Sequence, residues 1–370
     1  MELTGLGYDQ GLQETLRRSS TLRRASEIPL TLERTLTTGG EPNPSAPRTP
    51  NPEEEPEERK ELAPPGILSL EAIFLLAPFS IFGLLARLGI AALARYPNDA
   101  IFELAWVQAA GCLVMGIAQS QKAFIMTFYP PLYLGITTGF CGSLTTFASW
   151  QRDVFLAWIE GRPAGFSNWH RFLDGATRLF FTQAISVATF KCGLAIGKRR
   201  VHIMPQIPHR PLRVVITVVA LCTYIAVFPL FFVLPLSFRE EVTAALLFAF
   251  PGALTRHLLG TWLNAKKSNF PLGTFASNTA GTVISAIVYV LQHTHPVECN
   301  SSATAILQGL TDGYAGCLST VSTFVAEAYL MNRKDSWTYV LWSWISAQIL
   351  LVLVLGIPYW TMNLDRPFSC

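Results

Sequence analysis

Two short motifs, Gly139–Trp150 (GFCGSLTTFASW) and Gly313–Phe324 (GYAGCLSTVSTF), place glycines and hydroxyl side chains inside long apolar stretches. Residues of these types indicate an interrupted helix at membrane depth. In lipid, the backbone groups that an interruption frees are tolerated only where protein or a polar cavity satisfies them. Interrupted helices of this kind mark ion sites, so the chemistry expected at both motifs is the binding or passage of an ion.

The composition is that of a membrane protein. Of the 370 residues, 50% are hydrophobic and only 14% are charged, and the mean hydropathy is positive, which excludes an ordinary soluble domain. The net charge of +3 is small, and the basic residues gather in loops beside apolar segments, which argues against a nucleic-acid-binding face. The seven cysteines show no CxxC and no metal-type spacing, so we interpret them as small buried hydrophobes.

Nine apolar segments follow a polar N-terminal tail. Residues 1–66 are rich in Ser, Thr, Pro, Arg and Glu and cannot bury a core, so we expect a disordered cytoplasmic tail. Most later segments are close to the ~20 residues that cross ~30 Å of hydrocarbon. The third and eighth are longer and contain the interruptions, near Gly142 and Gly316. The segments span about 69–95, 99–119, 128–159, 170–197, 211–236, 241–264, 273–292, 304–331 and 337–360.

The loops indicate the orientation. Three basic clusters, Lys198–Arg200, Lys266–Lys267 and Arg333–Lys334, fall on one side if each segment crosses the membrane once. An excess of Lys and Arg marks the cytoplasmic side, which puts the N-terminus in the cytoplasm and the C-terminus outside the cell. Asn300 begins an Asn-Ser-Ser sequon in a loop expected outside, and both glycosylation and a chance sequon stay open there.

Segments one to four and six to nine match each other. On the first helix of each half, Gly83–Arg87 and Gly252–Arg256 share the spacing GxxxR, and on the second helix Gln108–Gly111 matches Asn278–Gly281. The extra segment 211–236 reverses the second half, so the halves form an inverted repeat with an ion site near the midplane. The expected regions are the tail 1–66, a first four-helix repeat 67–200, a linker helix within 201–238 and a second repeat 239–370.

The stretch Gly139–Phe147 is close to the signature GFCGGxTTF. With GxxxR and the polar residue followed by xxG, it resembles the CrcB/Fluc family of fluoride channels, and the overall layout resembles that family's fused eukaryotic fluoride exporters. The resemblance covers about residues 75–360. It implies an all-α integral membrane protein with nine transmembrane helices: two inverted four-helix repeats joined by a linker helix, with the third helix of each repeat broken. Because bacterial relatives are homodimers, one fused chain is expected to function as a monomer.

The resemblance also implies the activity of a fluoride-selective anion channel in the plasma membrane, with fluoride and the lipid bilayer as partners. Fluoride would leave passively, because a negative cell interior gives each departing anion ~2.3 kcal/mol per 100 mV. A fluoride/proton antiporter is the alternative, although Glu103 and Glu327 lie toward helix ends. A membrane scaffold is less favoured, as is an intramembrane enzyme, because no Ser or Cys elbow motif accompanies the histidines.

For the anion pathway, the resemblance points to a side-chain amide on the second helix, which can donate N–H groups to fluoride. The matching residues are Asn278 in the second half and Gln108 in the first, where the longer side chain is expected to impair conduction. Hydroxyl donors at Thr146, Ser322 and Thr323 would extend the track. Hydrogen bonds from these hydroxyls back to their own helix carbonyls are an equally open interpretation.

The family also uses two phenylalanines three residues apart on the third helix, whose positive ring edges can face an anion. The matching pairs are Phe147 and Trp150 in the first half and Val321 and Phe324 in the second. Combining the first position of one half with the second of the other gives one pathway with Phe147 and Phe324. The other pathway has Val321 and Trp150, with Gln108, so we expect one working pore and one vestigial pore.

At the two interruptions, the family holds a structural sodium ion by backbone carbonyls. The matching carbonyls belong to Gly142 and Thr145 in the first half and to Gly316 and Ser319 in the second. Carbonyl oxygens suit a small hard cation, and backbone ligands tolerate the exchange of Thr for Ser. We therefore expect a structural Na+ at the repeat interface, without a carboxylate ligand.

Three basic residues lie within or near the apolar segments. Arg87 and Arg256 occupy matched positions on the first helices and match the family's arginine. An intramembrane charge is a functional-site candidate, but an arginine that holds the broken helix through carbonyls is an equally good interpretation. Lys191 lies about two turns from the basic loop, where it either extends to the membrane surface or gathers anions in a vestibule.

Overall fold

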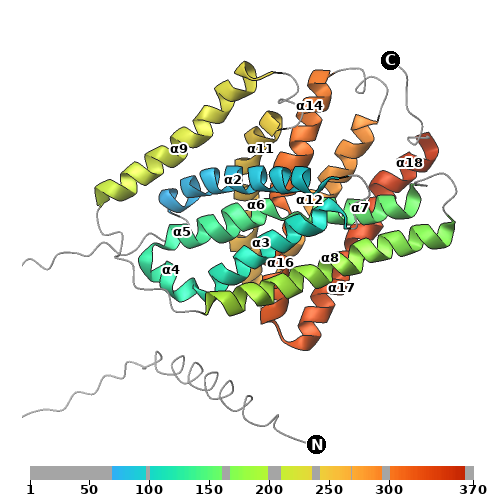
Figure 1. Ribbon diagram of the computed structural model, residues 1–370, viewed down its shortest axis with the longest axis horizontal. Helices are drawn as coiled ribbons and strands as arrows, with labels where there is room; N and C mark the ends of the chain where they lie inside the picture. Colours follow the sequence, from blue (N-terminus) through green and yellow to red (C-terminus); the bar gives the residue numbers. More distant parts are fainter. Residues whose placement is uncertain are drawn as a thin grey trace, which may run out of the picture. The chain divides into compact units, whose positions relative to one another are not determined.

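A computed structural model describes residues 69–96, 101–160, 167–198, 210–235, 242–267, 269–293 and 301–362. These residues belong to one compact unit, Leu62–Cys370, and all of their regular secondary structure is helical (Figure 1). The all-α class is therefore confirmed for the described part of the chain. The predicted tail 1–66 and the Asn300 sequon lie outside the described residues.

In the first half, three long helices accompany a chain of short ones. They are α2 (Leu70–Ala94), α3 (Glu103–Ser120) and α8 (Asn168–Gly197), with α4 (Lys122–Phe128), α5 (Pro130–Leu134), the π-helical turn η1 (Gly135–Cys141), α6 (Gly142–Leu144) and α7 (Phe147–Ile159) between α3 and α8.

In the described part of the chain, one helix, α9 (Arg210–Val233), separates the two halves in the sequence. The second half then shows a similar order of elements. They are α11 (Ala244–Leu263), the 3-10 turn η3 (Asn264–Lys266), α12 (Leu272–Gln292), α14 (Ser301–Gly309), the π-helical turn η4 (Leu310–Ala315), α15 (Gly316–Leu318), α16 (Ser322–Leu330), α17 (Arg333–Leu351), the π-helical turn η5 (Val352–Gly356) and α18 (Ile357–Met362).

Both predicted interruptions are present, at matched positions. In each half a π-helical turn and a three-residue helix lead into an extended residue, Thr145 (φ −92°, ψ 146°) in the first and Ser319 (φ −87°, ψ 157°) in the second. Helix α7 then begins at Phe147, capped by Thr146, whose Oγ1 accepts a hydrogen bond from the Ser149 amide at 3.3 Å. An extended residue leaves backbone groups outside the helical ladder, as a polar site at this depth requires.

Five helical stretches are long and apolar enough to cross a membrane, judged by length and composition over the described residues: α2, α8, α9, α12 and Arg333–Met362. The four other predicted crossings do not meet these limits of length and composition, for two reasons. The broken segments consist of helices of at most 13 residues, and α3 and α11 carry the buried polar residues Gln108 and Arg256. Membrane-spanning helices are therefore confirmed, whereas nine crossings stay a prediction from the sequence.

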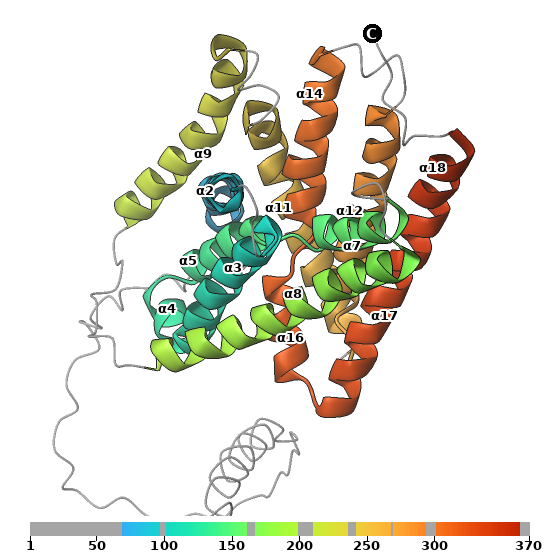
Figure 2. The same ribbon diagram turned by 45° about the vertical axis from the view of Figure 1, so that its right-hand side comes forward.

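The long helices of the two halves cross. In Figure 1, α2, α3 and α8 run across the view and α12, α14 and α17 run up it, and Figure 2 shows the same crossing. The short helices α6 and α15, which precede the two breaks, contact each other. The crossing therefore brings the two motifs together, as a site shared by the two halves requires.

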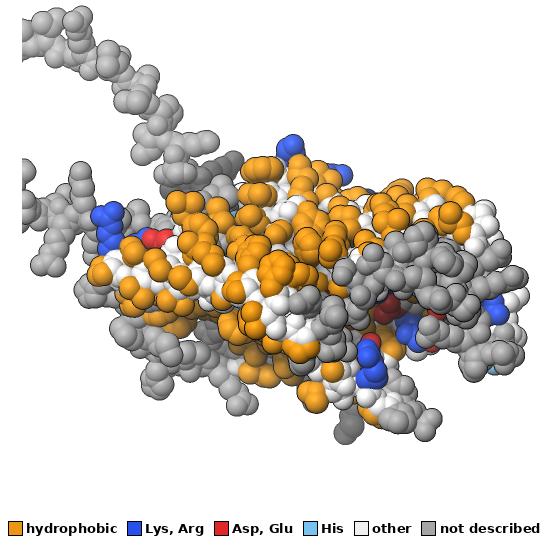
Figure 3. Space-filling model, turned by 90° about the horizontal axis from the view of Figure 1, so that it is seen from above, with side chains coloured by type: hydrophobic (Ala, Val, Ile, Leu, Met, Phe, Trp, Pro, Cys, Tyr) orange, Lys and Arg blue, Asp and Glu red, His pale blue; other side chains and the backbone are white. Residues whose placement is uncertain are grey.

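Helix α9 packs on α2 and exposes most of its length. Arg213 pairs with Glu71 at 3.0 Å, and of the residues of α9 only Ala220 and Val227 are buried. Apolar side chains also cover much of the described surface on the face seen in Figure 3. Such a surface suits contact with lipid rather than with water, and α9 contributes no side chain to the breaks.

Candidate ion site at the two helix breaks

Five hydroxyl side chains meet where the two breaks cross. We call them the hydroxyl cluster: Thr145, Thr146, Ser319, Thr320 and Ser322, all at most 1% exposed. The two halves exchange equivalent bonds there, because Thr145 Oγ1 accepts from the Ser322 amide at 3.0 Å and Ser319 Oγ accepts from the Ala148 amide at 3.1 Å. Each extended residue thus caps the helix that resumes in the other half.

The hydroxyl groups also bond to one another across the halves. Thr145 Oγ1 donates to Ser322 Oγ at 3.0 Å, and Thr146 Oγ1 lies 3.2 Å from Ser319 Oγ. Thr145 Oγ1 also lies 2.9 Å from its own helix carbonyl at Cys141. Of the three predicted track hydroxyls, Thr146 and Ser322 belong to this cluster, so part of their bonding capacity links the halves.

Two side-chain amides approach the breaks, one from the second helix of each half. Gln108 Nε2 donates to the Thr146 carbonyl at 2.8 Å, and Asn278 Nδ2 donates to the Thr320 carbonyl at 3.1 Å. Asn278 Oδ1 also accepts from the Thr320 amide at 2.7 Å, whereas the buried Gln108 Oε1 has no partner among the described residues. The longer side chain therefore makes only half of the interaction.

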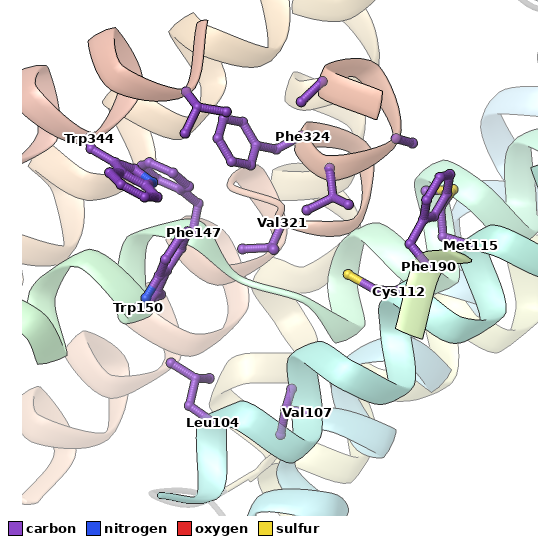
Figure 4. Close-up of a cluster of buried hydrophobic side chains, with 14 of the residues drawn as sticks. Leu104, Val107, Cys112, Met115, Phe147, Trp150, Phe190, Val321, Phe324 and Trp344 are labelled. Atoms are coloured by element: carbon purple, nitrogen blue, oxygen red, sulfur yellow. The ribbon is translucent and has the colours of Figure 1, made fainter. Parts of the chain in front are cut away.

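The aromatic side chains of the third helices form one buried group (Figure 4). The Phe147 and Phe324 rings, from opposite halves, lie edge-on with centroids 5.5 Å apart. Phe147 also contacts the Trp150 ring edge-on at 5.6 Å. Val321 belongs to the same cluster, so the residues predicted for two separate pathways lie close together.

The two intramembrane arginines each reach the broken helix of the other half. Arg87 Nη2 donates to the Asp312 carbonyl, and Arg256 Nη2 donates to the Thr138 carbonyl, which are matched positions before the two Gly motifs. Arg256 Nη1 also donates to the carbonyls of Gly142 at 2.8 Å and Ser319 at 3.2 Å. Of the two interpretations left open by the sequence, the geometry favours Arg256 as a holder of the break.

Arg87 is bonded much less completely. Its Nε and Nη1 groups are buried without a hydrogen-bond partner in the described part of the chain. Its guanidinium lies against Gly316, just as that of Arg256 lies against Gly142, and a Cβ on either glycine would collide with it. Arg87 thus keeps N–H donors that a small anion could use.

The four predicted sodium ligands are backbone carbonyls, and two of them converge. Gly142 O and Ser319 O come from different halves and both lie within hydrogen-bonding distance of one atom, Arg256 Nη1. No group of three or more His, Cys, Asp or Glu residues able to hold a metal ion occurs in the ranges that the structure describes. The oxygens present at the breaks are those of backbone carbonyls and hydroxyl groups, which suit a hard cation.

Lys191 and Thr323 lie outside the hydroxyl cluster. Lys191 is exposed on α8, and its Nζ lies 5.7 Å from the centroid of the Tyr329 ring. The Thr323 amide lies 3.5 Å from Thr320 Oγ1, and its side chain is partly exposed. Lys191 is thus separate from the central site, which favours its interpretation as a surface-directed residue.

Glu327 is linked through Tyr339 to the Phe324 ring, although the sequence places it toward a helix end. Its carboxylate accepts from the Tyr339 hydroxyl at 3.0 Å, from Thr274 Oγ1 at 2.7 Å and from Asn264 Nδ2 at 3.2 Å. The Tyr339 ring lies 5.0 Å from that of Phe324. The available signal was its spacing of three residues from Phe324, which puts both side chains on one helix face.

Comparisons with known proteins identify the family. The model of the "CrcB-like protein, Camphor Resistance (CrcB)" family matches two stretches, residues 74–194 and 243–357. Fluoride export protein 1 of Candida albicans is 31% identical over 318 residues, covering 77% of this chain and 79% of that protein. Fluoride export protein 1 of Schizosaccharomyces pombe is 32% identical over 302 residues, covering 76% and 94%.

A bacterial protein, the fluoride-specific ion channel FluC of Hahella chejuensis, is 33% identical over 87 residues, covering 23% of this chain and 64% of its own length. No solved structure matches the chain. The matched stretches contain both motifs, both arginines and both amides described above. The chain therefore belongs to the CrcB family of fluoride exporters and fluoride channels.

Proposed function

We propose that this protein is a fluoride-selective channel that lets fluoride leave the cytoplasm passively, at the crossing of the two broken helices. The observation that carries the proposal is the buried edge contact between Phe147 and Phe324, with ring centroids 5.5 Å apart. Fluoride is small and strongly hydrated, so a selective path must replace water by donors and positive ring edges. Two rings from opposite halves, beside amide and hydroxyl donors, meet that need.

A difference between the halves supports one working pore and one vestigial pore. Asn278 exchanges two hydrogen bonds with the backbone of Thr320, and its second amide N–H is left for an anion. Gln108 donates once, to Thr146, and buries an amide oxygen without a described partner. An unpaired amide oxygen repels an anion, so the Gln108 side is the poorer route.

The buried donors of Arg87 suit the recruitment of fluoride. Two nitrogens of the buried Arg87 guanidinium have no partner in the described part of the chain, against one in Arg256, and unpaired donors favour an anion nearby. The other two nitrogens of Arg256 donate to three carbonyls. We assign attraction of the anion to Arg87 and support of the break to Arg256.

We propose nine crossings in two inverted repeats, with a cytoplasmic N-terminus, an extracellular C-terminus and residence in the plasma membrane. The family match falls on two stretches separated by α9. The matched arginine contacts and the matched Thr145 and Ser319 contacts relate the two halves as equivalent partners. Because each half already completes the other, the chain is proposed to work as a monomer.

We also propose a structural Na+ held by the carbonyls of Gly142, Thr145, Gly316 and Ser319. Support comes from the convergence of Gly142 O and Ser319 O on the Arg256 Nη1 position. Each carbonyl has two lone pairs, so an ion would share these two oxygens with the guanidinium.

A second candidate function, a fluoride/proton antiporter, has one observation in its favour. Glu327 is a carboxylate linked through Tyr339 to the Phe324 ring, and such a group could carry a proton. Fluoride currents in a planar bilayer distinguish the two. For a channel, the reversal potential follows the fluoride gradient alone, whereas a reversal potential that moves with the proton gradient would establish the antiporter.

Fluoride efflux from liposomes containing the full-length protein tests the channel proposal. Phe324→Ile removes a ring edge while keeping an apolar side chain, and we expect efflux to fall about tenfold or more. Val321→Ile, at the position that matches Phe147, is the control and should leave efflux near the wild-type rate. Trp150→Phe is a second control, chosen over alanine because Trp150 packs on Phe147 and truncation would open a cavity.

The opposite pattern would refute the assignment. If Phe324→Ile conducted normally while Val321→Ile or Trp150→Phe abolished efflux, the second pathway would be the working one. Liposomes that leak fluoride no faster with wild-type protein than without it would refute the channel itself.

A further inference from the structure

An apolar groove of about 910 Å³ runs along the outside of the protein between the two halves. One wall is α8, the last long helix of the first half, and the other is formed by α16 and α17 of the second half. Exposed aromatic side chains line it, among them Tyr329 at 46% and Trp337 at 58% exposure. In a membrane, a groove of this kind is filled by hydrocarbon, either of a lipid or of another protein segment.

The two ends of the groove differ in a way that suits a lipid. At one end lie Lys191 on α8 and Arg333 at the start of α17, and the lining includes no acidic residue. Neither cation has an ion-pair partner within the described ranges. At the other end, Phe180 and Trp344 close the groove with ring centroids 5.8 Å apart.

The length of the groove corresponds to one leaflet. Lys191 and Phe180 are eleven residues apart on α8, and Arg333 and Trp344 are eleven residues apart on α17. At 1.5 Å per residue this is about 16 Å, close to half of the ~30 Å hydrocarbon core.

We infer that this groove binds a phospholipid with an anionic headgroup, with an acyl chain between α8 and α17 and the phosphate between Lys191 and Arg333. The cation over the Tyr329 ring, at 5.7 Å, is held at the mouth by the ring face. Under the proposed topology both cations face the cytoplasm, whose leaflet is rich in anionic lipids. The lipid joins helices of opposite halves, and so stabilises their association.

The groove also lies against the outer side of the aromatic cluster around Phe147. Trp344, which closes its deep end, contacts Trp150 edge-on at 6.2 Å, and Trp150 contacts Phe147. An acyl chain against Trp344 therefore supports the packing around the ring pair from outside. Loss of the lipid should loosen this packing as well as the contact between the halves.

Thermal unfolding of the full-length protein in detergent micelles, titrated with phosphatidylserine or phosphatidylcholine, tests the inference. We expect phosphatidylserine to raise the Tm by about 5 °C at saturation and phosphatidylcholine to do much less. The double variant Lys191→Gln with Arg333→Gln should lose the difference between the two lipids. Lys122→Gln is the matched control, because Lys122 also lies 5.7 Å from a tyrosine ring, that of Tyr133, but outside the groove.

A second variant separates the groove from the charges. Ala188 lines the groove and is exposed, so Ala188→Trp fills the groove without disturbing the core and should abolish the shift with both cations intact. Equal shifts with both lipids, or loss of the shift in Lys122→Gln, would overturn the inference. So would a dimer in micelles that Ala188→Trp dissociates, since a second copy would then cover the groove. The readout does not involve fluoride, so a negative result leaves the channel proposal standing.

Discussion

Replacing Arg256 by glutamine is expected to destabilise the protein far more than the same change at Arg87. The two arginines occupy matched positions, are equally buried at 5% exposure and reach across to the other half in the same way. They differ in what they bond. Arg256 donates to the carbonyls of three residues, Thr138, Gly142 and Ser319, whereas Arg87 donates to one carbonyl, that of Asp312.

The magnitude follows from these bonds. A hydrogen bond from a charged donor contributes about 1.5–3 kcal/mol, and removal of a buried charge gives back part of its desolvation cost. For Arg256→Gln, three lost bonds outweigh that return, and we expect a loss of about 3 kcal/mol in the free energy of unfolding. For Arg87→Gln, one lost bond is offset by the removal of two nitrogens that have no hydrogen-bond partner in the described part of the chain, so the change should lie within about 1 kcal/mol of zero.

Chemical denaturation in detergent micelles measures both variants. The surface variant Arg95→Gln is a suitable control, because Arg95 is 74% exposed in its pair with Glu103 and such pairs contribute little. Fluoride efflux provides a second readout, in which Arg87→Gln should slow transport although it keeps the fold. Equal destabilisation by the two buried arginines, or a larger loss at Arg87, would refute the division of roles between them.

Three further outcomes are expected. In the liposome assay, Asn278→Ala should reduce fluoride efflux by about tenfold or more, whereas Gln108→Ala should change efflux little. The reason is that only Asn278 exchanges two hydrogen bonds with the break. Equal losses of efflux in the two variants would contradict this expectation. Gly142→Ala should destabilise the protein by displacing the Arg256 guanidinium, and Gly89→Ala, with nothing within 4 Å of its added Cβ, should be neutral or slightly stabilising in thermal unfolding. Replacing Na+ by a large organic cation should lower the Tm of the wild-type protein, and an unchanged Tm would argue against the structural ion.

The parts of the site that depend on local sequence could be predicted. Glycines and hydroxyl residues in Gly139–Trp150 and Gly313–Phe324 predict breaks near Gly142 and Gly316, three residues before the extended residues Thr145 and Ser319. The resemblance to the CrcB/Fluc family, applied to matching positions of the two halves, implied the pairing of Phe147 with Phe324, and the structure has that contact. The location of the breaks rests on short-range spacing, which a single sequence preserves.

The rest depends on how helices cross, which spacing does not encode. The carbonyls that each arginine bonds in the other half lie more than a hundred residues away along the chain. Which carbonyl is bonded follows from the crossing of the halves. Glu327 looked peripheral because hydropathy alone puts it near a helix end. Its neighbours Asn264, Thr274 and Tyr339 come from three other elements, and their convergence is visible only in three dimensions.

The exchange of arginines between the halves has a consequence for how such a molecule can evolve. When two identical subunits trade a side chain, every substitution is imposed on both ends of the exchange at once. Once they are joined in a single gene, each end mutates alone, so one guanidinium can become a brace while its twin keeps free donors. Asymmetry between twin sites is then an ordinary result of covalent linkage, while the exchange itself ties the halves together, because each arginine bonds a carbonyl of the other half.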